Sequence, residues 1–116
     1  MRFLSRNIMS REKGAIAEKK AGDFLKQRGF EIVEYNFFSK YGEIDIIALK
    51  DNIVHFVEVK SGVNFNPVYA ITAKKIERIL KTIKYYILLN SLDLPYCIDA
   101  ICIKDGSISF IENITF

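Results

Sequence analysis

Acidic and basic side chains at two-residue spacing mark two neighbouring segments of the chain. The first segment carries Glu43 and Asp45, and the second carries Glu58 and Lys60. Residues two apart in a β-strand point to the same face, so each pair would share a face. A tight turn centred on Asp51-Asn52 sets Asp45 opposite Glu58, with Cβ atoms roughly 4.5–5.5 Å apart. The same register sets Glu43 opposite Lys60, whereas a slip of one residue would scatter the four over both faces.

This grouping suggests metal-dependent chemistry, because two opposed carboxylates repel each other. At an effective dielectric constant near 20, two unit charges 4 Å apart repel by ~4 kcal/mol. A divalent cation would turn that repulsion into coordination, and oxygen ligands in an open site favour Mg²⁺ or Mn²⁺. Lys60 beside such an ion would position or activate an attacking water and offset developing charge. The alternative is a solvated hairpin face with ordinary charges.

Apolar neighbours favour the metal site over the solvated face. Strands that are apolar on both faces are usually central and covered. Carboxylates in such strands need a partner, because an unpaired buried charge costs several kcal/mol. An ion pair of Lys60 with Glu58 or Glu43 would satisfy one acid but not three. The apolar positions are Ile44, Ile46, Ile47 and Ala48 in the first segment and Val54, Phe56, Val57 and Val59 in the second.

Periodicity and turn signals predict the helices and strands that carry these charged side chains. Ser10 and Thr72 are candidate helix N-caps, and Asp105-Gly106 is a strong hairpin signal. The order αβββαββ predicts an α/β (α+β) domain with one mixed sheet and helices packed against it. Residues 1–9 are expected to form a leader and residues 10–116 a single domain. The expected helices are 11–28 and 73–89, and the expected strands are 30–38, 43–49, 53–60, 96–103 and 108–114.

Composition limits the classes of function. Lys and Arg total 17 against 14 Asp and Glu, a net charge of +3, which is compatible with nucleic acid. No apolar run approaches the ~20 residues of a membrane span, and residues 1–9 lack a secretory h-region, so we expect a cytoplasmic protein without membrane contact. Cys97 and Cys102 fall on opposite faces of a strand and predict buried, inert thiols. The single His55 excludes a His-rich metal site.

The second expected helix carries a candidate nucleic-acid surface. Lys74, Arg78 and Lys81 cluster with Tyr85 opposite an apolar face formed by Ile76, Ile79, Leu80, Ile83 and Ile87. Such a basic ridge can track phosphates, and an aromatic ring can stack on an unpaired base. The alternative is a solvated helix face. The loop 61–71, with Phe65 and Tyr69, is expected to contact substrate or a second copy.

The motifs resemble those of a known superfamily. Gly42-Glu-Ile-Asp45-Ile-Ile followed by Phe56-Val-Glu58-Val-Lys60 resembles the D…E-x-K signature of the PD-(D/E)xK, restriction-endonuclease-like superfamily. Over residues 13–116 the chain resembles the bacterial YraN-like family of uncharacterised proteins, which are predicted endonucleases. That resemblance adds the helix motif Gly14-x-x-Ala17-Glu18-x-x-Ala21, Lys75 early in the second helix, and Asp99 in a late strand.

The resemblance implies a mixed sheet of about five strands flanked by helices, and divalent-metal hydrolysis of phosphodiesters. It implies Asp45 and Glu58 as metal ligands, the Val59 carbonyl as a third, and Lys60 as the catalytic lysine. Glu18 would join the site through water or a second metal, or else be an exposed helix charge. Glu43 would contact the metal or pair with Lys60.

The chain departs from the family's pattern at one place, and its motif also resembles that of a second group of proteins. The family commonly has Arg-Phe before the late-strand Asp, where this chain has Cys97-Ile98. Asp99 would orient Lys75 or another cation, or satisfy a polar strand end. Archaeal Holliday-junction resolvases are similar across the pattern of Glu18, Asp45 and Glu58-x-Lys60, which implies branched DNA and a homodimer by analogy.

The sequence therefore predicts an endonuclease that uses Mg²⁺ (or Mn²⁺) to hydrolyse DNA, without a small-molecule cofactor. Candidate DNA-binding residues are Lys74, Lys75, Arg78 and Lys81. The alternatives are a non-catalytic nucleic-acid-binding module and a dimeric interaction protein whose carboxylates are structural.

Overall fold

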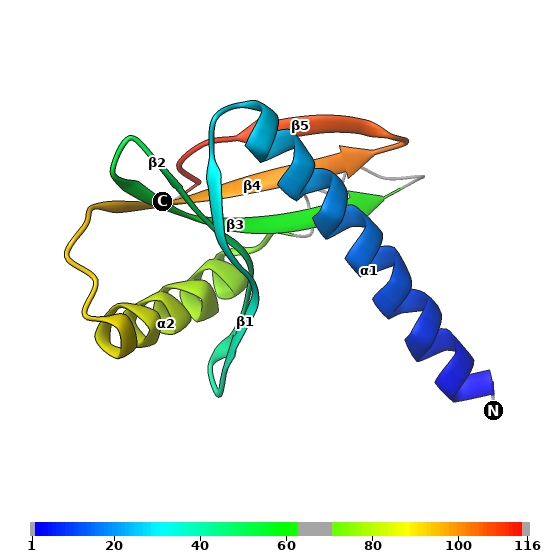
Figure 1. The fold of residues 1–116 in the computed structure, drawn as a ribbon. Coiled ribbons are helices and arrows are strands. Elements are labelled where there is room, and N and C mark those ends of the chain that lie inside the picture. Colours follow the sequence, from blue (N-terminus) through cyan, green and yellow to red (C-terminus); the bar gives the residue numbers. More distant parts are fainter. Residues whose placement is uncertain (1, 63–70, 115–116) are drawn as a thin grey trace.

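The computed structural model describes residues 2–62 and 71–114, with side chains from residue 14 onward. The elements follow the predicted order αβββαββ (Figure 1). Phe65 and Tyr69, proposed above as substrate or dimer contacts, lie outside the described residues. The elements are α1 (Arg2–Gln27), β1 (Glu31–Ser39), β2 (Gly42–Lys50), β3 (Ile53–Gly62), α2 (Ala73–Asn90), β4 (Tyr96–Lys104) and β5 (Ser107–Ile111).

One mixed sheet of five strands forms the centre of the molecule, which confirms the predicted fold class. The strands lie side by side in the order β1-β2-β3-β4-β5. β3 and β4 are parallel, and the other neighbours are antiparallel. Helix α2 connects β3 to β4, because parallel neighbours need a crossover that returns the chain to the same end of the sheet.

The two helices cover opposite faces of the sheet and create two cores (Figure 1). On one face, Ala21 and Leu25 of α1 pack with Ile46, Val57 and Ile101. On the other, residues of α2 pack against the alternate side chains of the same strands, including Ile47, Phe56 and Ile98. The central strands are therefore covered on both sides, as their continuous apolar runs predicted.

Local signals placed most boundaries correctly. Thr72 caps α2, because its side-chain oxygen accepts a hydrogen bond from Lys75 N at 3.2 Å. Asp105 and Gly106 both have positive φ, 50° and 84°, as the two central residues of a type I′ hairpin require.

The start of the first helix was predicted wrongly. Helix α1 begins at Arg2, not after a cap at Ser10. Residues 2–9 contain neither glycine nor proline. Nothing local therefore stops the helix, and the preference of serine for caps is too weak to do so. The structure shows no described helix that is both long enough and apolar enough to span a membrane.

Candidate functional site

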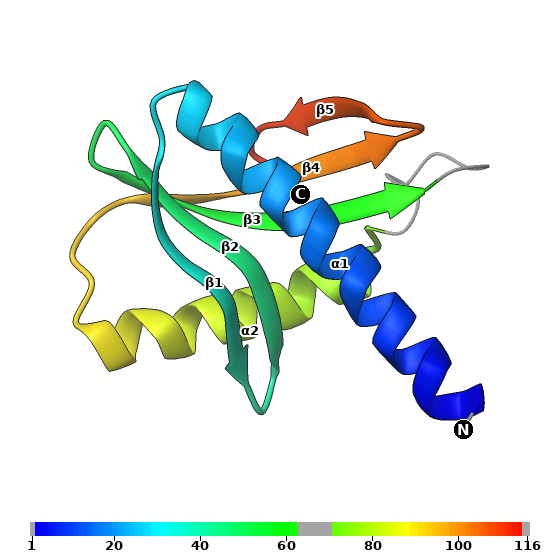
Figure 2. The ribbon, with the colours of Figure 1, turned by 45° about the vertical axis from the view of Figure 1, so that its right-hand side comes forward.

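The site forms where β2 and β3 separate. Their ladder follows the predicted register from Lys50–Ile53 to Ile46–Val57, where the paired residues end. Beyond that point β2 continues beside β1, while β3 continues beside β4 as far as the pair Gly62–Lys104. Figure 2 shows the β1–β2 hairpin running away from β3. We call this separation the fork.

The fork corrects the geometry predicted for the four charged residues. Asp45 and Glu58, and likewise Glu43 and Lys60, were expected to be directly opposed in the ladder. Both pairs lie beyond its last paired residues, Ile46 and Val57, so they are not ladder neighbours. Their side chains approach one another across the opening instead.

Strand β2 also turns over at the fork. Ile46 packs in the core under α1, whereas Ile44 packs in the core under α2. Two residues apart in a regular strand would share a face, so the strand rotates at Asp45 between them. In β1 the matching position is Asn36, which lies between the partners of Ile46 and Ile44 and has φ of 54°.

Asp45 lies at the point where β2 and β3 separate. Its Oδ2 accepts a hydrogen bond from the backbone N of Val59 at 2.8 Å, a donor that β2 no longer pairs. Burial, followed by the nearby charge of Glu58, raises the pKa of Asp45 to about 8, although the bond from Val59 opposes this rise. A half-buried carboxylate in such a site is unstable as an anion unless a cation accompanies it.

Two more carboxylates approach Asp45 from the α1 side. One carboxylate oxygen each from Glu18, Glu43 and Asp45 lie within 4.8 Å of one another. Glu18 of α1 therefore points inward, toward the site, rather than being an isolated exposed charge. Burial first, and then the charges of Glu18 and Glu58, raise the pKa of Glu43.

Asn36 is a site residue that the sequence analysis missed. Its Nδ2 donates a hydrogen bond to Glu18 Oε2 at 2.8 Å and so holds this carboxylate beside Asp45. Asparagine adopts positive φ more readily than most residues. An asparagine inside the aromatic run of β1 was the available signal.

Glu58 and Lys60 approach from the other side of β3. Their alternation with Val57 and Val59, which pack under α1, directs them toward the α2 face. Lys60 Nζ lies 2.9 Å from Glu58 Oε1, and the Glu58 side chain is largely buried. Burial lowers the pKa of Lys60, but the bond to Glu58 and the charges of Glu58 and Asp45 outweigh it, so the pKa is raised. Lys60 therefore stays an ammonium group beside the acids.

Lys75 interacts with Lys60 of the site, unlike the exposed basic residues of the same helix. Burial, its hydrogen bond with Lys60 and the positive charge of Lys60 lower the pKa of Lys75. Lys74, Arg78 and Lys81 are exposed along α2, as predicted. All three lie on α2, the helix that also carries Lys75.

The donor set fits a hard divalent cation. Asp45, Glu18 and Glu43 offer oxygen atoms within 4.8 Å. Bonds of about 2.1 Å to Mg²⁺ would draw such atoms slightly closer together. Glu58 is bonded to Lys60 and lies outside this group of three, and Val59 contributes its N–H to Asp45.

Asp99 lies elsewhere. It was expected to orient Lys75 or another cation, or to satisfy a strand end. Its carboxylate instead contacts His55 Nδ1 at 2.5 Å and accepts a hydrogen bond from Asn113 N at 2.8 Å. Both cysteines are free, as predicted, although Cys97 is only half-buried.

Comparison with known proteins identifies the family. The family model described as uncharacterised protein family UPF0102 matches residues 17–103. A UPF0102 protein of Helicobacter pylori strain P12 is 54% identical over 116 residues, all of both chains. UPF0102 proteins of Helicobacter hepaticus and Wolinella succinogenes are 56% and 50% identical, over 91% and 92% of this chain and 96% and 99% of theirs. The chain therefore belongs to the uncharacterised protein family UPF0102, which is the YraN-like family that its motifs resemble.

Proposed function

We propose that this protein is a divalent-metal-dependent endonuclease that hydrolyses phosphodiester bonds of DNA. The observation that carries the proposal is the fork, where Asp45, Glu18 and Glu43 bring carboxylate oxygens within 4.8 Å of one another. A structural sheet gains nothing from three acids at one opening, because like charges destabilise it. A cation and a phosphate group would offset that repulsion.

Each residue at the fork would have its own role in the hydrolysis. Asp45, Glu18 and Glu43 would hold Mg²⁺ or Mn²⁺ directly. Glu58, which pairs with Lys60, and the Val59 carbonyl would be further donors, directly or through water. The bound ion would supply Lewis acidity and a more acidic water. Lys60, kept charged by Glu58, positions the attacking water and stabilises the negative charge that develops on the phosphate.

The nucleic-acid surface is expected along α2. Lys74, Arg78 and Lys81 are exposed on this helix, and Lys75 reaches toward Lys60. Cations spaced along a helix can contact successive phosphates and guide the strand into the fork. By analogy with the junction resolvases that share the motif, we propose branched DNA as the substrate and a homodimer as the acting form.

Cleavage of four-way and linear DNA with Mg²⁺, Mn²⁺ or EDTA tests this proposal. We expect metal-dependent cleavage that falls by about 100-fold or more in Asp45→Asn and in Lys60→Ala. Lys20→Ala, an exposed cation of α1, is the matched control and should keep full activity. Salt-dependent DNA binding without cleavage under any metal would instead identify a non-catalytic binding module.

A further inference from the structure

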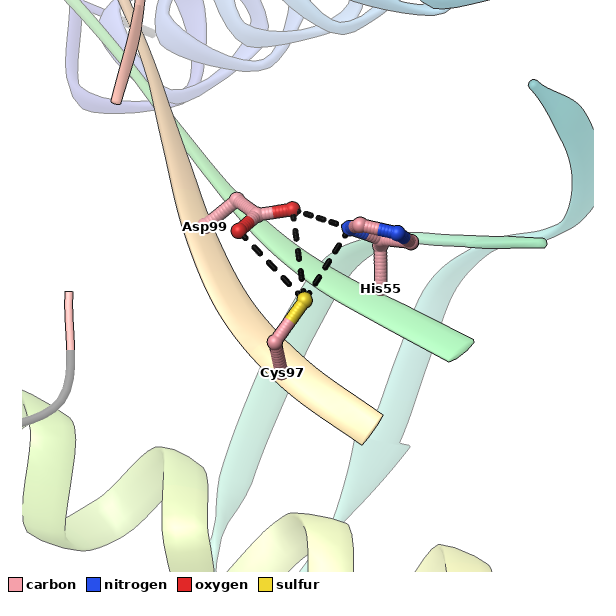
Figure 3. A group of neighbouring side chains, drawn as sticks. All are labelled: His55, Cys97 and Asp99. Carbon is pink, nitrogen blue, oxygen red and sulfur yellow. Dashed lines mark hydrogen bonds and ion pairs between the residues drawn. The ribbon is translucent and has the colours of Figure 1, made fainter. Parts of the chain in front are cut away.

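A second cluster of metal-binding side chains lies on β3 and β4, apart from the fork. His55 and Cys97 are direct neighbours in the parallel ladder, and Asp99 follows on the same face of β4. Figure 3 shows the three side chains pointing toward one another between the two strands. Asp45, Glu58 and Lys60 belong to the other cluster, where β2 and β3 part.

The three donor atoms converge on one small space. Cys97 Sγ lies 3.1 Å from His55 Nδ1 and 3.6 Å from Asp99 Oδ1. His55 Nδ1 lies 2.5 Å from Asp99 Oδ2. Around one Zn²⁺, tetrahedral donors with bonds of about 2.0–2.3 Å lie roughly 3.3–3.6 Å apart. Small outward shifts of these side chains would therefore admit the ion.

The burial of Asp99 calls for a positive charge. Its side chain has no exposed surface, and among the described residues its only ion-pair partner is His55. A buried carboxylate is costly unless a cation accompanies it, and a protonated imidazole or a bound metal ion can fill that role. A divalent ion bound by all three side chains would neutralise both the carboxylate and the thiolate.

The geometry argues against a nucleophilic triad. In a Cys-His-Asp triad, the acid and the nucleophile use different nitrogens of the imidazole. Here the same atom, Nδ1, faces both Cys97 and Asp99.

We propose that His55, Cys97 and Asp99 form a Zn²⁺-binding site that joins β3 to β4. A thiolate, an imidazole and one carboxylate are the donors that select Zn²⁺ over Mg²⁺. Cys97 and His55 are partly exposed, so an ion from solution can reach the cluster. Asp99 also accepts the bond from Asn113 N, which ties the segment after β5 to the same point.

Titration of metal-free protein with Co²⁺ tests this site. Co²⁺ bound to a thiolate gives a charge-transfer band that carboxylate sites cannot give. We expect this band with one equivalent of Co²⁺, its loss on addition of Zn²⁺, and a higher melting temperature with Zn²⁺. Cys97→Ser should abolish the band. Cys102→Ser, the same change at the other thiol of β4, and Asp45→Asn, at the fork, should keep it.

Specific results of this titration would contradict the proposed Zn²⁺ site. Absence of the band in the folded wild type, or its persistence in Cys97→Ser, would overturn the proposal. If Cys97→Ser does not fold, His55→Asn is the second variant, because its side-chain amide can still donate a hydrogen bond to Asp99. That variant should fold and lose Zn²⁺ binding, and unchanged binding would count equally against the site. The Co²⁺ band does not depend on nuclease activity, so this test is independent of the function proposed for the fork.

Discussion

At the scale of single residues, Asp45 has two opposed effects on the protein. Its carboxylate accepts the N–H of Val59 and so completes the backbone hydrogen bonding at the fork. Its negative charge is disfavoured by burial and by Glu58, which raise its pKa to about 8. The residue is therefore well suited to bind a cation and poorly suited to remain an anion alone.

Asp45→Asn should stabilise the metal-free protein. The pKa of Asp45 is higher folded than unfolded, so the folded state binds more protons between the two values. The free energy of unfolding of the wild type in EDTA should accordingly fall as pH rises from about 4 to about 8. Asparagine keeps an acceptor for Val59 without the charge, and we expect about 1 kcal/mol or more of added stability at pH 8.

Urea unfolding across this pH range measures the effect. Millimolar Mg²⁺ should stabilise the wild type and leave Asp45→Asn unchanged, which reverses their order once the ion is strongly bound. Lower stability of the variant in EDTA at pH 8 would contradict the repulsion inferred at the fork.

Asn36 is expected to act through Glu18. Asn36→Gly removes the amide that holds Glu18 while keeping the positive φ that this position requires. Loss of such a supporting hydrogen bond typically lowers metal affinity or activity by about 10–100-fold. DNA cleavage rates at several Mn²⁺ concentrations would measure this loss. An unchanged rate would mean that the hydrogen bond from Asn36 to Glu18 is not needed for the reaction.

At the scale of elements, a close contact joins α1 to β1. Gly22 faces Tyr35 of β1 so closely that an added Cβ would lie 2.1 Å from the tyrosine hydroxyl oxygen. Gly14, in the same helix, has no atom within 4 Å of its Cβ position. The two glycines therefore offer a matched pair of substitutions.

Gly14→Ala should stabilise the protein by up to about 1 kcal/mol, because alanine favours the helix. Gly22→Ala should destabilise it by about 1–3 kcal/mol, because Tyr35 or the whole helix must move. Thermal unfolding compares the two variants. Tyr35→Ala in the Gly22→Ala background should recover most of the loss, and no recovery would show that the tyrosine is not the obstacle.

The exposed basic residues of α2, Lys74, Arg78 and Lys81, are expected to affect the salt dependence of DNA binding rather than the cleavage step. Lys81→Ala should weaken DNA binding and lower the slope of log K against log salt by about 1. Lys20→Ala on α1 removes the same charge from an exposed helix outside the ridge and should leave the slope unchanged. Fluorescence anisotropy with labelled DNA over a range of salt concentrations measures both. Equal slopes for the wild type and both variants would place the DNA elsewhere.

At the scale of the whole molecule, the sequence was sufficient for the fold and for the charged residues at the fork, but not for Asn36 or for the shape of the opening. Alternation and turn signals located Asp45, Glu58 and Lys60 and the hairpin register that leads to them. The fork was missed because strand pairing beyond Ile46 depends on how β3 leaves β2 for β4. The cluster at His55 was missed because it depends on the parallel register of β3 and β4, which local sequence does not encode.

The parallel pair also has a consequence for synthesis. Three carboxylates at the fork, those of Glu43, Asp45 and Glu58, lie on strands that pair through local hairpins. The partner of β3 on its other edge is translated much later, since Gly62 pairs with Lys104. At 5–20 residues per second, that interval corresponds to roughly 2–8 s on the ribosome. During this time the edge of β3 has no strand beside it, so its unpaired N–H and C=O groups are open to pairing with another chain.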